Sequence, residues 1–121
     1  MPQQPWPSRD QPRVGTRVEY DVSTVTDTVI LAAVAGQKAR ILRGWLHNLS
    51  TTTTATITFI DSAGDISKDF RIPAEGKMFF GYDATPADFY ESDTAGSALS
   101  VDQDTAVQVI GEFYVEYWST P

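Results

Sequence analysis

The stretch AVQVIGEFYVEYW, residues 106–118, decides the fold class of this chain. One set of alternate positions is apolar or aromatic and comprises Val107, Val109, Phe113, Val115 and Tyr117. The other set is more polar and comprises Gln108, Glu112, Tyr114, Glu116 and Trp118. An alternation of period two predicts a long β-strand with one face on a core and the other toward solvent. Gly111 interrupts this strand and predicts a bulge or bend there.

Seven further strands are predicted upstream at a spacing of about ten residues, with turn residues between them. They cover residues 16–22, 27–34, 39–49, 55–61, 67–72, 77–82 and 98–102. No helical period is present in any of these segments. We therefore predict an all-β fold: an antiparallel β-sandwich of about eight strands, with a jelly roll as the favoured topology.

The predicted strand over residues 39–49 is long and carries apolar residues on both faces. Strict alternation places Leu42 and Leu46 on one face, and Ile41, Trp45 and Leu49 on the other. This pattern predicts a strand that is covered on both sides for part of its length.

The chain divides into an extended arm over residues 1–15 and one sandwich domain over residues 16–121. The arm holds four of the seven prolines and one large apolar residue, Trp6. Such a segment buries too little apolar surface to fold alone. We expect it to lie on a neighbouring protein, with Trp6 as the anchor and Arg9, Arg13 and Arg17 paired with carboxylates of the receiving surface.

The composition excludes several classes of function. The formal net charge is −7, which disfavours binding to nucleic acid. There is no cysteine, so neither disulfides nor thiol chemistry is expected. No apolar run approaches the length of a membrane span, and no signal peptide is recognisable, so we expect a protein made in the cytoplasm.

No pattern of residues predicts catalysis, and we expect a protein that is not an enzyme and uses no cofactor. His47 is the only histidine and falls inside a predicted strand, where a partly exposed structural role is the simpler interpretation. Residues 83–96 form an acidic segment that offers Asp83, Asp88, Glu91 and Asp93 as calcium ligands. Their spacing matches no EF-hand pattern, and a solvated loop is the simpler interpretation.

Four aromatic residues, Trp45, Phe79, Tyr114 and Trp118, remain open to two interpretations. They suit a platform on which a sugar stacks, but packing in the core or at a subunit interface, where Tyr and Trp are enriched, is the simpler interpretation. Because Tyr114 and Trp118 lie on the polar face of the last strand, we expect them at an interface with another copy or another protein.

The sequence from Lys77 to Trp118 resembles small β-sandwich proteins of tailed-phage virions. The resemblance rests on an apolar strand ending in a turn (Phe79 to Tyr82) and on the loop aromatics Phe89 and Tyr90. It rests also on a G-x-x-L strand (Gly96, Leu99) and a final strand with Val109, Gly111 and Tyr117. Extended to the two preceding strands, it covers residues 39–118 and omits the arm.

The resemblance implies a non-enzymatic structural protein of the virion, of the capsid decoration or cement type. Its partners would be the major capsid protein and further copies of itself, as a homotrimer or homodimer. It would be assembled in the host cytoplasm and end on the capsid surface. The alternative is a head-fibre or tail-associated module that binds a receptor or glycan.

Overall fold

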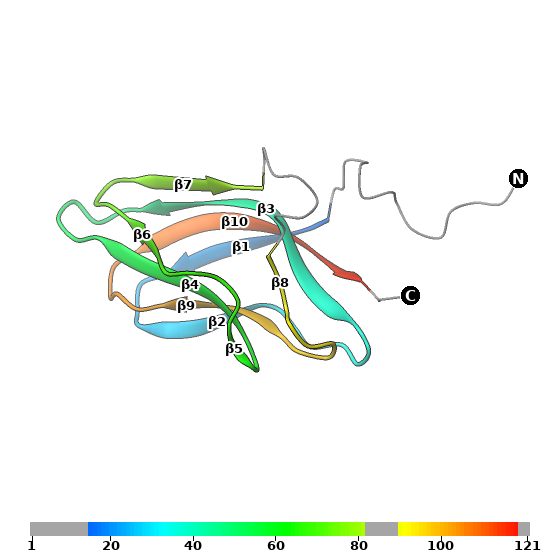
Figure 1. The fold of residues 1–121 in the computed structure, drawn as a ribbon. Helices are drawn as coiled ribbons and strands as arrows, with labels where there is room; N and C mark the ends of the chain where they lie inside the picture. Colours follow the sequence, from blue (N-terminus) through cyan, green and yellow to red (C-terminus); the bar gives the residue numbers. More distant parts are fainter. Residues whose placement is uncertain (1–14, 82–89, 119–121) are drawn as a thin grey trace, which may run out of the picture.

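The computed structural model describes residues 15–81 and 90–118, which form ten β-strands in two sheets (Figure 1). All of the strand pairs are antiparallel, and the sheets pack face to face. This arrangement confirms the predicted β-sandwich.

Sheet A contains the first and the last strand of the chain side by side. Its order is β1 (Thr16–Val22), β10 (Val109–Trp118), β3 (Lys38–Asn48) and β7 (Lys77–Phe80), with β8 (Tyr90–Glu91) on the N-terminal part of β3. Sheet B has the order β2 (Thr26–Leu31), β9 (Leu99–Gln103), β4 (Ala55–Asp61) and β5 (Gly64–Asp65). A further strand, β6 (Phe70–Ile72), pairs with the N-terminal part of β4.

Strands β5 and β8 have two residues each, too few for a periodic pattern, and they account for the excess over the eight predicted strands. The other eight strands follow the orders β1-β10-β3-β7 and β2-β9-β4-β6, which is the strand arrangement of a jelly roll. The prediction that residues 83–96 form a loop throughout is wrong at Tyr90 and Glu91, which form β8.

The core between the sheets is centred on Phe59. Its ring lies 5.1–6.0 Å from the rings of four other aromatic residues, namely Phe70, Phe80, Tyr90 and Phe113. Fully buried aliphatic residues from both sheets, including Ile41, Leu46, Ile57 and Val101, complete the same cluster. Rings in tilted and edge-on contact add attraction beyond their buried area.

The bulge lies on β3 and not at Gly111, where the sequence predicted it. Tyr114 pairs with Arg43 but Val115 pairs with Ile41, so Leu42 is the extra residue. The bulge reverses the alternation, so that Ile41 and Leu46 both belong to the core while Leu42 lies outside that cluster. The sequence prediction, which placed Ile41 on the same face as Trp45 and Leu42 on the same face as Leu46, is therefore wrong. Residues 39–42 are all buried, as expected.

Gly111 is required for a different reason. It pairs in regular register with Tyr20 and Leu46, and a Cβ at this position would lie 2.1 Å from the Trp45 carbonyl oxygen. The backbones of β10 and β3 thus approach too closely for any side chain at residue 111.

Candidate functional site

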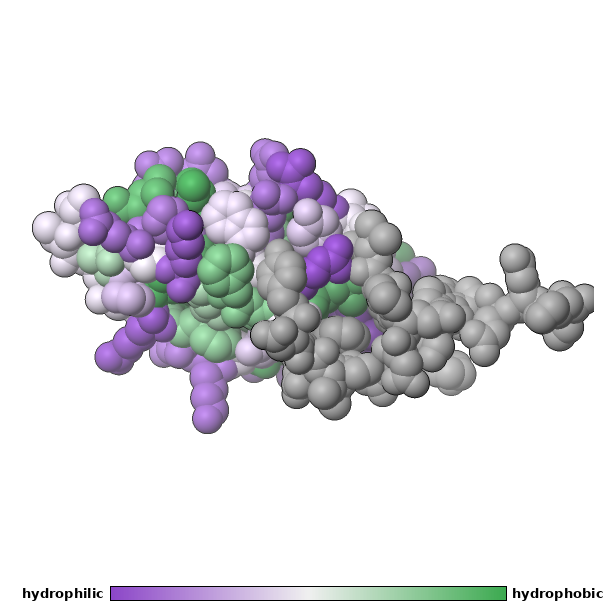
Figure 2. Space-filling model, turned by 90° about the horizontal axis from the view of Figure 1, so that it is seen from above, coloured by the Kyte–Doolittle hydropathy of each residue, from purple (hydrophilic) through white to green (hydrophobic). Residues whose placement is uncertain are grey.

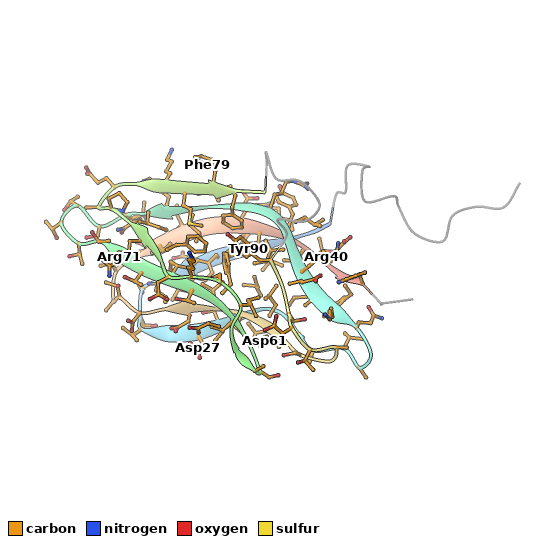
Figure 3. The ribbon with its side chains drawn as sticks, in the orientation of Figure 1. Asp27, Arg40, Asp61, Arg71, Phe79 and Tyr90 are labelled. Atoms are coloured by element: carbon orange, nitrogen blue, oxygen red, sulfur yellow. The ribbon has the colours of Figure 1, made fainter. Side chains whose placement is uncertain are left out.

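The outer face of sheet A carries two aromatic side chains next to each other. Trp45 on β3 lies directly opposite Phe79 on β7 in the strand register. Figure 3 shows Phe79 on the side of β7 that faces away from the sandwich, whereas Tyr90 lies between the sheets. Phe79 is 64% exposed, the largest value among the exposed large apolar residues of the described chain. We call Trp45 and Phe79 the aromatic pair.

Polar side chains occupy the rows on either side of the aromatic pair. In one row His47 is opposite Lys77, and Ile110 adjoins His47 on β10. In the other row Arg43 is opposite Tyr114, and its guanidinium carbon lies 4.2 Å from the centre of the Tyr114 ring. Figure 2, which looks onto the β7 side, shows apolar and hydrophilic side chains interspersed on this face.

Acidic and basic side chains are unevenly distributed over this face. The outward side chains of β3 and β7 beside the aromatic pair include Arg43 and Lys77 and no acid. The acids lie on β10 and β1. There Glu112 forms an ion pair with Arg17, with 2.6 Å between Glu112 Oε2 and Arg17 Nε. Arg17 also contacts Glu19 at 2.7 Å. Among the described residues, Trp45 thus has Glu112 beside it on β10, whereas the rows on either side of the aromatic pair carry the basic residues Arg43 and Lys77.

A second cluster surrounds Arg40 at the other end of β3, and it holds Trp118 in place. Arg40 is 2% exposed and lies between Glu91 and Glu116, at 3.5 and 3.6 Å. Its guanidinium carbon is 4.1 Å from the centre of the Trp118 ring, and Trp118 Nε1 donates to Glu91 Oε2 at 2.8 Å. This cluster connects the end of β10 to β3 and β8.

The predicted interface residues on described strands therefore all have contacts within their own chain. Arg17 is engaged by two glutamates, Tyr114 by Arg43, and Trp118 by Arg40 and Glu91. The other predicted arm residues, Trp6, Arg9 and Arg13, lie outside the described residues. Of the four aromatics of the proposed sugar platform, the strand pairing places Trp45 beside Phe79, Tyr114 one row away, and Trp118 near the end of β10.

The outer face of sheet B is acidic. Asp27 on β2 is opposite Asp102 on β9, with Asp104 and Asp65 also close enough to act on Asp102. Partial burial, then the charge of Asp27 and a side-chain hydrogen bond with it, raises the pKa of the Asp102 carboxyl above its ordinary value. These acids are a source of repulsion between β2 and β9.

The structure tests the calcium hypothesis only in part, because Asp83 and Asp88 lie outside the described residues. Glu91 points to Arg40 and Trp118, and the Asp93 amide donates to Asp61 Oδ2 at 2.7 Å. Within residues 15–81 and 90–118, no three acidic or histidine side chains are placed to hold a metal ion. His47 lies on β3 opposite Lys77 and Ile110, within a strand as the sequence predicted.

Sequence reasoning missed the basic residues around the aromatic pair. Arg43 and Lys77 stand two residues from Trp45 and Phe79, respectively, so each shares a face with its aromatic neighbour by simple alternation. What the sequence lacked was the pairing of β3 with β7, which brings the two segments together.

Comparison of the chain with protein-family models, with curated proteins and with solved structures gives no match. The resemblance to virion sandwich proteins therefore stays a prediction. In the part of the chain that the structure describes, no helix has the length and apolar character needed to cross a membrane.

Proposed function

We propose that this protein is a non-enzymatic decoration or cement protein of a phage capsid. The observation that carries the proposal is the jelly-roll order of the strands, β1-β10-β3-β7 facing β2-β9-β4-β6. Jelly rolls are recurrent in viral capsid domains. The resemblance of residues 39–118 to virion sandwich proteins supports the same role.

The proposed mechanism is mechanical reinforcement of the capsid shell. A sandwich that bridges neighbouring subunits of the major capsid protein adds interface free energy to the shell. An interface of about 1,600 Å² supplies affinities from micromolar to far tighter, depending on its anchor residues. Capsid sites are symmetric, so the protein would act as a homotrimer or homodimer on the capsid surface.

The anchor in this proposal is the segment over residues 1–15. Trp6 would provide the apolar contact, and Arg9 and Arg13 would pair with acids of the shell. Arg17, the fourth predicted anchor, is held by Glu19 and Glu112 in the described structure. Within the proposal its role is therefore to fix the start of β1 rather than to reach the capsid.

The test is binding of the full chain to capsids that lack it, measured by co-sedimentation and by the copy number at saturation. Deletion of residues 2–13 should leave the sandwich folded and abolish binding. Arg9→Glu with Arg13→Glu should weaken binding, whereas the matched reversal Lys68→Glu with Arg71→Glu, at exposed positions, should not. Unchanged affinity of the truncated chain would refute the anchor, and saturation at a dozen copies or fewer would refute a role over the whole shell.

A further inference from the structure

The aromatic pair places two aromatic side chains next to each other on the outer face of sheet A. Cross-strand neighbours on one face of a sheet have Cβ atoms about 5 Å apart, so Trp45 and Phe79 together cover roughly the area of one or two sugar rings. The face of an aromatic ring carries partial negative charge and attracts the polarised C–H groups of a sugar ring. A pair with one exposed ring, Phe79, and one half-buried ring, Trp45, is a suitable floor for a saccharide.

The groups around this floor are those that bind saccharide hydroxyls and carboxylates. Lys77 and His47 lie in the row on one side, and Arg43 lies in the row on the other. Lysine and arginine donate only, and their positive charge favours a ligand with a carboxylate. Glu112, the residue opposite Trp45 on β10, is already paired with Arg17 at 2.6 Å.

This distribution favours a saccharide over a protein as the ligand. The centre of a protein–protein interface is depleted in charged residues, and its apolar core is broad. On sheet A, basic side chains begin one row from the aromatic pair on both sides. The apolar area is therefore narrow, and its rim is rich in hydrogen-bond donors.

We propose that Trp45 and Phe79 bind an acidic saccharide by stacking, with Lys77, His47 and Arg43 contacting its carboxylate and hydroxyl groups. This activity goes beyond the decoration role. It would let a protein that sits on a particle also attach to a carboxylate-bearing polysaccharide outside it. The proposal rests only on described residues and does not depend on the segment over residues 1–15.

The test titrates the full chain with sialyllactose and with lactose, which lacks the carboxylate-bearing sugar, and follows backbone amide signals by NMR. Sialyllactose should shift signals of β3 and β7, and lactose should bind more weakly. Phe79→Ala, a change at a 64% exposed side chain, should weaken sialyllactose binding about tenfold. Val29→Ala, at a 58% exposed residue of sheet B, is the matched control and should leave binding unchanged.

Charge provides the second arm of the test. Lys77→Gln should reduce the preference for sialyllactose over lactose, and high salt should do the same, because exposed charges are screened. Equal binding of both sugars by the unmodified chain would overturn the acidic character of the ligand.

Two further outcomes would overturn the proposal. One is failure of sialyllactose, a hyaluronan tetrasaccharide and trigalacturonic acid all to bind at millimolar concentration. The other is a loss of capsid binding in Phe79→Ala without any saccharide binding by the unmodified chain. That second result would assign the aromatic pair to a protein interface and leave the decoration role intact, so the two proposals fail separately.

Discussion

Gln103 is expected to be one of the most sensitive polar positions of the fold. Its side chain is fully buried, and its Nε2 lies within hydrogen-bond distance of the carbonyl oxygens of Val22, Thr105 and Val107, at 3.2, 3.0 and 2.7 Å. Its Oε1 accepts a hydrogen bond from the Tyr20 hydroxyl at 2.9 Å. One amide thus connects β9, β1 and the segment between β9 and β10.

Replacement of Gln103 by leucine, an apolar residue of similar size, removes all of these bonds. A hydrogen bond contributes about 1 kcal/mol net, and a buried donor left without an acceptor costs about 1–3 kcal/mol. The Tyr20 hydroxyl would be such a donor, because Tyr20 is 2% exposed. We expect Gln103→Leu to lower the free energy of unfolding by about 3–5 kcal/mol, a large part of the 5–15 kcal/mol typical of a domain.

Urea denaturation followed by tryptophan fluorescence measures this loss as a shift of the midpoint at unchanged slope. The matched control is Gln108→Leu at an exposed position, which should change the free energy by no more than about 0.5 kcal/mol. Tyr20→Phe combined with Gln103→Leu should cost less than the sum of the two single changes, because both remove the same bond. The reasoning is refuted if Gln103→Leu matches the Gln108 control, or if the double change is additive.

Three other substitutions test separate parts of the structure. Gly111→Ala should cost about 3 kcal/mol in urea denaturation, because its Cβ would meet the Trp45 carbonyl oxygen at 2.1 Å. Glu75→Gly should raise the free energy of unfolding by about 0.5 kcal/mol, since Glu75 has a φ of 61°, where only glycine is unstrained. Asp102→Asn should raise the stability at neutral pH, measured as the thermal midpoint, and should flatten the dependence of that midpoint on acidic pH.

The sign of the pH effect follows from the raised pKa of Asp102 in the folded state. The folded protein holds this proton more tightly than the unfolded chain does, so its contribution is complete below the unfolded pKa and is lost as pH rises through the folded pKa. The unmodified chain should therefore lose more stability than Asp102→Asn between acidic and neutral pH. Parallel pH profiles of the two proteins would contradict the repulsion between Asp27 and Asp102.

For Gly111 and Glu75, the opposite results are equally informative. A tolerated alanine at residue 111 would mean that β10 and β3 do not approach as closely as the structure places them. A destabilising glycine at residue 75 would mean that the strain at this turn is smaller than the entropy that glycine adds to the unfolded chain.

The sequence by itself determined the fold class and most of the strands. Residues 16–22 and 55–61 were predicted with the bounds of β1 and β4, and the alternation in residues 109–115 correctly separated buried Val109, Phe113 and Val115 from their neighbours. Period-two alternation is a local property, since each strand must present one face to the core whatever its partner is. Turn residues between the strands are local in the same sense.

The tertiary structure alone decided which outward residues meet and which have partners inside the chain. Contacts between distant segments determine the bulge at Leu42, the pairing of Trp45 with Phe79, and the packing of the Trp118 ring against Arg40. Gln103, which falls just outside the predicted strand over residues 98–102, is buried because β1 and the segment after β9 close over it. Register is set by the fit of two sheets to one core, and a shift of one residue exchanges the faces, so no single strand contains this information.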